Sequence, residues 1–260
     1  MFAPFQAAMR TLAVLIAAWQ ALVWVFSPPR YILPAPLDVL GALWRQPGYF
    51  FANTWVTLVE IAAGFVAGTF IGIATALCVA ALPRFGNLVW PMVLVSQAFP
   101  VFVIAPLLVL WFGFGMASKV VMTTLIIFFP VASAFADGLR RIDPEIIDAT
   151  AITEASHWQT LIHVRVPLAL PSLVSGLCVA ASLAPLGAVI GEWVGASAGL
   201  GFVMVQANAR MQTDTAFAAM AIIALLTLAL RRAVDWLGPL LTPWAEENEF
   251  PRHPNEWKRP

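Results

Sequence analysis

An all-α bundle of membrane-spanning helices is the fold class that this sequence predicts, from three observations. Hydrophobic residues make up 61% of the 260 positions and charged residues only 11%, so much of the surface must face lipid rather than water. Six apolar runs approach the roughly 20 residues that cross a bilayer. None of them alternates with period two, as the strands of a membrane barrel would. We therefore expect a polytopic bundle of about six transmembrane helices.

The six predicted spans cover residues 8–26, 54–82, 88–112, 119–139, 168–191 and 214–236. The segments between them are too short for a soluble domain, so we expect residues 1–260 to form one membrane domain, with a core at about 54–239. Arg10 and the run after it are also compatible with a cleavable signal, but no small-residue cleavage site follows Phe26, which favours a retained helix. Prolines predict kinks or breaks in the third and fifth spans, at Pro91, Pro100, Pro106 and Pro185.

The basic residues predict the orientation of the chain. Fourteen Lys and Arg balance fourteen Asp and Glu, which removes the electrostatic argument for a nucleic-acid partner. If the N-terminus is cytoplasmic, only four basic residues lie outside: Arg30, Arg45, Lys119 and Arg210. The other ten lie inside, as the positive-inside rule requires. We expect both termini and the 140–167 loop in the cytoplasm.

Cysteine, histidine and glycine positions indicate packing rather than chemistry. Cys78 and Cys178 lie inside apolar runs, and His157 and His163 are too far apart in helical register to bind one metal ion, so we expect no metal site. Glycines recur every fourth residue in the second span and around the end of the fifth, at Gly64, Gly68, Gly72, Gly187, Gly191, Gly195 and Gly199. This spacing suits either a subunit contact or close packing within the bundle, and we favour the latter.

The stretch Asp143–Pro171 is more polar and better capped than a passive connection requires. Asp143-Pro144-Glu145 has an N-cap, an N1 proline and an early acidic residue, and Ser156 with Gln159 forms a capping box. These signals predict two short cytoplasmic helices that meet near Thr153–Ala155. We expect Pro167 to end the second helix before the chain re-enters the membrane.

This loop resembles the EAA motif of ABC importer permeases, in which E-A-A, three residues, glycine, nine residues and I-x-L-P follow in order. Asp148-Ala149-Thr150 takes the place of E-A-A, Glu154 that of the glycine, and Val164–Pro167 that of I-x-L-P. Three positions depart from the motif, and Glu154 matters most, because a left-handed backbone there costs a non-glycine residue about 1 kcal/mol.

The resemblance implies a type I ABC importer permease fold in a bacterial inner membrane, and a docking role for the loop. The residues implied in coupling to the ATPase are Asp148, Ala149, Thr150, Glu154, Ala155, Ser156, Trp158 and Pro167. It also implies cytoplasmic ATPase subunits, an extracytoplasmic solute-binding protein and a second permease copy. The sequence contains no G-x-x-x-x-G-K-[ST] phosphate-binding loop, so we expect no cofactor here, and ATP and Mg to be used by the partner.

Two other classes of protein are less consistent with the sequence. An ion-coupled secondary transporter would use ionisable groups deep in the membrane, for which Glu60 and Glu192 are candidates, but it often shows internal repeats and this chain shows none. A membrane enzyme would need a convergent catalytic set, and no such motif is present.

Polar groups near the outer ends of the last two spans are candidates for the solute pathway or for the side that meets the capture protein. They are Glu192, Trp193, Gln206, Asn208 and Arg210, and Gln97 and Pro100 join them by similarity to the nitrate, sulfonate and taurine branch of the family. Residues 184–195, 198–201 and 207–212 look like permeases for thiamine pyrimidine precursors such as hydroxymethylpyrimidine. A sulfonate, taurine, nitrate or riboflavin-like solute is the alternative. We expect Arg210 as a partner for Glu192.

Overall fold

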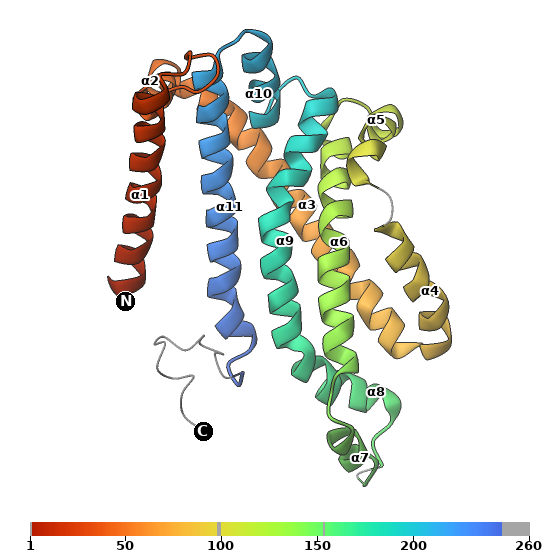
Figure 1. Ribbon diagram of the computed structural model, residues 1–260. Helices are drawn as coiled ribbons and strands as arrows, with labels where there is room; N and C mark the ends of the chain where they lie inside the picture. Colours follow the sequence, from red (N-terminus) through yellow and green to blue (C-terminus); the bar gives the residue numbers. More distant parts are fainter. Residues whose placement is uncertain (1, 98–99, 153, 246–260) are drawn as a thin grey trace.

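The computed structural model describes residues 2–97, 100–152 and 154–245, and every regular element in these ranges is a helix (Figure 1). Five helices are long and apolar enough to cross a membrane. They are α1 (Phe2–Phe26), α3 (Pro47–Ala81), α6 (Met116–Arg140), α9 (Val166–Gly195) and α11 (Thr213–Leu241). The prediction of a membrane helix bundle is confirmed.

The third predicted span, 88–112, is a bent pair of helices that together are long and apolar enough for a sixth, broken span. It consists of α4 (Pro83–Ser96) and α5 (Val101–Phe112), which are bent relative to each other by more than 40°. Pro100 is the N-cap residue of α5, where an extended backbone starts the new helix. Pro91, Pro106 and Pro185 remain inside helices. The predicted break therefore occurs at one of the four prolines.

Short helices cover both ends of the bundle (Figure 1). The sequence did not predict α2 (Pro36–Arg45) or α10 (Leu200–Ala209), which lie at the end opposite to the Asp143–Pro171 loop. At the loop's own end are α7 (Pro144–Ile152), α8 (His157–Thr160) and the π-helical turn η1 (Leu161–Arg165). We call the loop end the inner end and the α2 end the outer end, following the sequence-based orientation.

Helices α3, α6 and α9 form the core, because glycines let their backbones approach closely. A Cβ atom added to Gly64 would lie 2.4 Å from Thr123 Cβ, and one on Gly68 would lie 2.5 Å from Ile127 Cγ1. From α9, a Cβ on Gly187 would lie 2.7 Å from Cα of the same Thr123. The glycine repeats therefore pack helices within one chain, as we favoured.

Helix α1 stands at the edge of the bundle, next to α2 (Figure 1). None of the residues from Met9 to Phe26 is buried. Its described contacts include Trp19, whose ring lies 5.6 Å from that of Phe217 and whose indole nitrogen donates to the carbonyl of Pro34 at 3.1 Å. Most of the α1 surface is therefore not covered by the rest of this chain.

Candidate functional site

The inner loop is built by local caps that the sequence predicted. The amide of Glu145 donates to Asp143 Oδ1 at 2.9 Å, which starts α7. Ser156 and Gln159 form the expected capping box, with the Ser156 amide donating to Gln159 Oε1 at 2.8 Å and the Gln159 amide donating to Ser156 Oγ at 3.3 Å. The Thr160 hydroxyl donates to the Thr150 hydroxyl at 3.3 Å, which links α8 to α7. The expected meeting point includes Thr153, which lies outside the described residues.

Pro167 does not end the second loop helix, which corrects the prediction. The chain continues from α8 through η1 directly into α9, as one helical run from His157 to Gly195. Pro167 stands at the start of α9, where its missing amide donor is tolerated, and the wider π-helical turn precedes it. The loop is therefore joined to a membrane helix without an intervening flexible segment.

The outward surface of the loop carries apolar and acidic side chains. Asp148, Ala149 and Glu154 are exposed, and Trp158 has 55% of its surface exposed. Ile152, which the sequence analysis did not single out, is 85% exposed. Ala155 and Thr150 are half-buried at the junction. An exposed isoleucine and tryptophan at a polar membrane face favour a protein contact.

Two side chains that sequence reasoning missed bind the loop to the bundle. The Arg165 guanidinium donates from Nε and Nη2 to the Leu139 carbonyl at 3.2 and 2.7 Å, near the C-terminal end of α6. His157 Nε2 lies 3.2 Å from the carbonyl of Ala81, the last residue of α3. Side-chain donors near helix C-termini can satisfy carbonyl groups that lack helical partners. The loop is therefore hydrogen-bonded to the C-terminal ends of α3 and α6.

The backbone at Glu154 is left-handed, with φ of 56°. This is the conformation that the motif's glycine would adopt without penalty, and a residue with a Cβ pays about 1–2 kcal/mol for it. The strain that the sequence analysis considered at Glu154 is therefore present.

At the outer end, Glu192 is buried inside the chain, with 1% of its surface exposed. Its carboxylate accepts hydrogen bonds from the Thr57 hydroxyl, at 2.6 Å, and from the amide of Gly201. The Thr57 hydroxyl also accepts from the Leu200 amide at 2.7 Å. These residues satisfy the free amides at the start of α10 and tie it to α3 and α9. We call Asn53, Thr57 and Glu192 the α10 cap, since Asn53 Oδ1 accepts from the Gly199 amide at 2.8 Å.

This geometry corrects two expectations. Glu192 lies in the protein interior, and the hydrogen-bond partners of its carboxylate are Thr57 and Gly201 rather than Arg210. Lys119, counted among the outer charges, is also buried, and its ammonium donates to the carbonyls of Phe114, at 2.5 Å, and of Gly195. Glu192 therefore joins the start of α10 to α3, and Lys119 joins the start of α6 to the end of α9.

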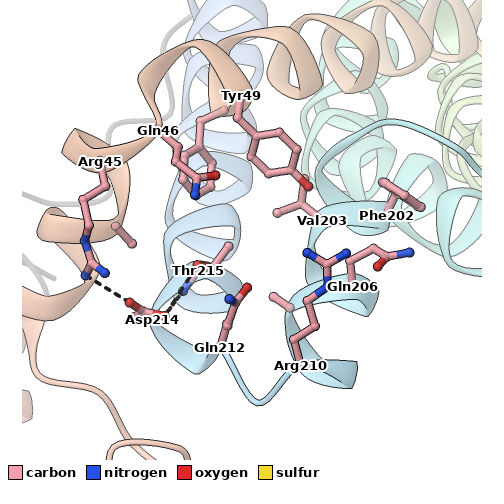
Figure 2. Close-up of a pocket in the computed structure, with 13 residues that line it drawn as sticks. Arg45, Gln46, Tyr49, Phe202, Val203, Gln206, Arg210, Gln212, Asp214 and Thr215 are labelled. Carbon is pink, nitrogen blue, oxygen red and sulfur yellow. Dashed lines mark hydrogen bonds and ion pairs between the residues drawn. The ribbon is translucent and has the colours of Figure 1, made fainter.

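An outer pocket of about 490 Å³ lies among α2, α10 and the starts of α3 and α11 (Figure 2). Its polar lining comes from Arg45, Gln46, Tyr49, Gln206, Arg210, Gln212, Asp214 and Thr215. Arg45 Nη2 lies 3.2 Å from Asp214 Oδ2, which ties α2 to α11. Figure 2 shows Arg210 extending beside Gln206 toward Val203. The pocket therefore combines hydrogen-bond donors and acceptors at the outer end.

The structure separates the remaining predicted pathway residues. Gln206 and Arg210 line the outer pocket, whereas Asn208 is exposed and not among the lining residues. Trp193 is 52% exposed and lines a different, apolar cavity of about 660 Å³ between α9, α10 and α11. Gln97 and Pro100 are exposed on either side of the α4–α5 break.

Residues 64–246 match the family described as the binding-protein-dependent transport system inner membrane component. A probable ABC transporter permease protein of Haemophilus influenzae is 46% identical over 86% of this chain and 91% of its own length. The riboflavin transport system permease of Chloroflexus aurantiacus is 36% identical, over 90% of this chain and 88% of its own.

The formylaminopyrimidine transport permease of Halalkalibacterium halodurans is 32% identical, over 90% of this chain and 94% of its own. The taurine transport permease of Escherichia coli is 30% identical over 91% of this chain and 89% of its own. The fold is similar to that of a chain in inward-facing structures of the MetNI methionine ABC transporter, with a TM-score of 0.61 at 20% identity over 77% of this chain and 97% of that one.

These matches exclude the secondary-transporter and membrane-enzyme alternatives and agree with the apolar helices of a multi-pass inner-membrane protein. The chain belongs to the inner-membrane-component family of binding-protein-dependent transport systems, as the permease subunit of an ABC importer and not as an enzyme itself.

Proposed function

We propose that this permease passes ATPase motion to its membrane helices through the surface of Asp148–Trp158. The observation that carries the proposal is the loop's two-sided construction. Its outward side exposes Ile152 and Trp158, and its inner side is fixed to α3 and α6 by His157 and Arg165. A partner that pushes on the exposed side therefore displaces helix ends directly.

Shape and apolar area contribute more to this contact than charge. Asp148 and Glu154 are exposed, and exposed ion pairs contribute only about 0–1 kcal/mol. Aromatic and other large apolar anchors dominate binding energy at protein interfaces, which points to Trp158 and Ile152. Ala149 matters because a small side chain lets the partner surface approach.

The complete importer, in this proposal, contains two permease copies, two cytoplasmic ATPase subunits and one external capture protein. One chain supplies one docking loop, and a two-fold arrangement pairs two such loops with two ATPases. ATP and Mg are bound by the ATPase partner. The termini and the loop lie in the cytoplasm, as the ten inner basic residues favour.

The coupling role is tested with Ala149→Asp and a matched Ala209→Asp control, which places the same charge at an exposed outer position on α10. Each variant is purified with the ATPase subunit. We expect Ala149→Asp to lose ATPase co-purification and uptake, since it buries a charge in the contact, while Ala209→Asp retains co-purification. Equal co-purification of both variants would remove the loop from the mechanism.

For the solute, we propose a small nitrogen heterocycle of the pyrimidine-precursor type, such as hydroxymethylpyrimidine. Support comes from the relative named for formylaminopyrimidine, which is 32% identical over 90% of this chain. The relative named for riboflavin, at 36% identity, supports a nitrogen heterocycle in general, and the taurine permease is 30% identical. The half-exposed Trp193 ring offers a stacking surface for a planar ring. Riboflavin-like, nitrate, sulfonate and taurine solutes are the alternatives.

The solute is tested by purifying the partner capture protein and measuring its affinity for hydroxymethylpyrimidine, riboflavin and taurine. Tight binding of the pyrimidine, with stimulation of ATPase activity in the reconstituted importer, is the expected result. Binding of taurine alone would exclude the heterocycle and leave the permease assignment intact.

A further inference from the structure

Two glutamates and a lysine lie together in the interior of the bundle, beside the start of α10. Glu60, on α3, is 3% exposed, and Glu192 and Lys119 are each 1% exposed. One helical turn after Glu60 and Lys119, at Gly64 and Thr123, α3 and α6 are so close that a Cβ on the glycine would touch the threonine. Three ionisable groups from α3, α6 and α9 therefore share one buried site.

Backbone carbonyls use all the hydrogen-bond donors of the lysine. Lys119 Nζ donates to the carbonyls of Phe114, Gly115 and Gly195. An ammonium has three N–H groups, so none remains for either glutamate. The single positive charge can still compensate one nearby carboxylate through space, but a second ionised carboxylate in the same site would lack compensation.

Glu192 has the surroundings of an ionised carboxylate. The Thr57 hydroxyl and the amides of Gly201 and Phe202 donate to it, and amides at a helix start favour a negative charge. The Glu192 side chain is also hydrogen-bonded to the side chain of Glu60. Glu192 is therefore the carboxylate whose charge the site compensates.

Glu60 has the opposite surroundings. Its Oε2 atom is buried and receives no hydrogen bond from the residues that the structure describes. A buried charge without donors is costly, and a carboxyl group in such a place becomes neutral by taking up a proton. Two ionised carboxylates also cannot hydrogen-bond to each other, because neither has a proton to donate. The hydrogen bond between Glu60 and Glu192 therefore requires a proton, and Glu60 is the group that carries it.

We propose that Glu60 and Glu192 bind one proton between them, with Glu60 as a neutral carboxylic acid that donates to the Glu192 carboxylate. With this proton, Lys119 and Glu192 carry one positive and one negative charge, so the buried site is neutral overall. The proton also supplies a further donor to the carboxylate that holds the start of α10. None of the three side chains lines the outer pocket, so the proton is a structural component of the fold and lies apart from that polar surface.

Infrared spectroscopy of the purified full-length permease tests for the proton directly, because a protonated carboxyl absorbs apart from ionised carboxylates. We expect the wild-type chain at neutral pH to show this band and Glu60→Gln to lose the intensity of one carboxyl group. The control Glu145→Gln, which removes an exposed carboxylate at the start of α7, should retain the full band. A wild-type spectrum without the band, or a band that Glu60→Gln leaves unchanged, would overturn the proposal.

The pH dependence of unfolding counts the proton. In the unfolded chain a glutamate is ionised above about pH 5.5, so the folded state binds one more proton and becomes less stable as the pH rises. The charged groups that act on Glu60 are Glu192 from α9 and Lys119 from α6, and Glu60→Gln retains both. Between about pH 6 and 8, we expect the folding equilibrium constant of wild type to fall about tenfold more per pH unit than that of Glu60→Gln. Equal pH dependence would show that Glu60 is ionised in the folded chain and would refute the proposal.

Glu192→Gln determines which of the two carboxyl groups holds the proton. At position 60 a glutamine still donates to Glu192, whereas at position 192 its NH₂ group replaces an acceptor that faces several donors. At neutral pH we expect the melting temperature of Glu60→Gln within about 2 °C of wild type and that of Glu192→Gln at least about 5 °C lower. The reverse order, or failure of Glu60→Gln to fold, would contradict the assignment of the proton to Glu60.

Discussion

Replacing Thr57 by valine tests whether the α10 cap stabilises the fold. Valine retains the shape of threonine but removes the hydroxyl, so the Glu192 carboxylate loses a donor and the Leu200 amide loses an acceptor. All three groups belong to buried residues. Each buried polar group left without its partner costs about 1–3 kcal/mol. We expect Thr57→Val to lower the free energy of unfolding by about 2–4 kcal/mol, toward the lower end if the carboxylate finds another donor.

The matched control is Thr69→Val on the same helix. The Thr69 hydroxyl is buried and has no hydrogen-bond partner among the described residues, so its removal strands no group. We expect a change within about 0.5 kcal/mol of wild type, or slight stabilisation. The free energies are measured by equilibrium unfolding in mixed detergent micelles. If both variants unfold alike, the cap does not contribute and Glu192 must be satisfied in another way.

Three further outcomes follow from the loop and the cap. Glu154→Gly should stabilise the loop by up to about 1 kcal/mol, because glycine adopts the left-handed backbone without strain. Glu154→Gln removes the charge but retains the strain, so comparing the thermal unfolding of the two variants distinguishes the effect of the backbone from that of the charge. Arg165→Gln should uncouple ATPase activity from uptake while ATPase co-purification persists, because it releases the loop from α6; normal uptake would contradict this. Gly201→Ala should lower thermal stability, since its Cβ would lie 2.7 Å from Glu192 Oε2 and 2.9 Å from the Val189 carbonyl; an unchanged melting temperature would show that the cap adapts.

Features encoded locally could be predicted from the sequence. The spans follow from apolar length, and the start of α7 and the capping box at Ser156 depend on residues within three positions of one another. The break at Pro100 was predicted among four prolines but not located, since a proline near a helix start is tolerated and only packing decides which one interrupts the helix.

Features that depend on distant contacts could not be predicted. The cost of a carboxylate in a span predicted that Glu192 would face protein or water, but its partner Thr57 lies 135 positions earlier and could not be identified from the sequence. The hydrogen bond from Arg165 to the Leu139 carbonyl likewise joins residues 26 positions apart. No local pattern distinguishes Arg165 from any other basic residue at the membrane face. Exposed Ile152 could have been noticed as an apolar residue in a polar loop.

The two clusters of hydrogen bonds explain how a push at the inner end can reach the outer end. His157 and Arg165 attach the loop to the last residues of α3 and α6, and the loop continues into α9 through unbroken helix. Since glycines bring α3, α6 and α9 into backbone contact, these helices cannot shift independently without opening voids.

At the outer end, Thr57 and Glu192 attach α10 to α3 and α9. In the proposed coupling mechanism, displacement of the loop would therefore carry α10 along with α3 and α9. Two separate cavities, of about 660 and 1220 Å³, lie along α9 and α11, so the packing between these two helices is less complete than the glycine-mediated packing of α3, α6 and α9.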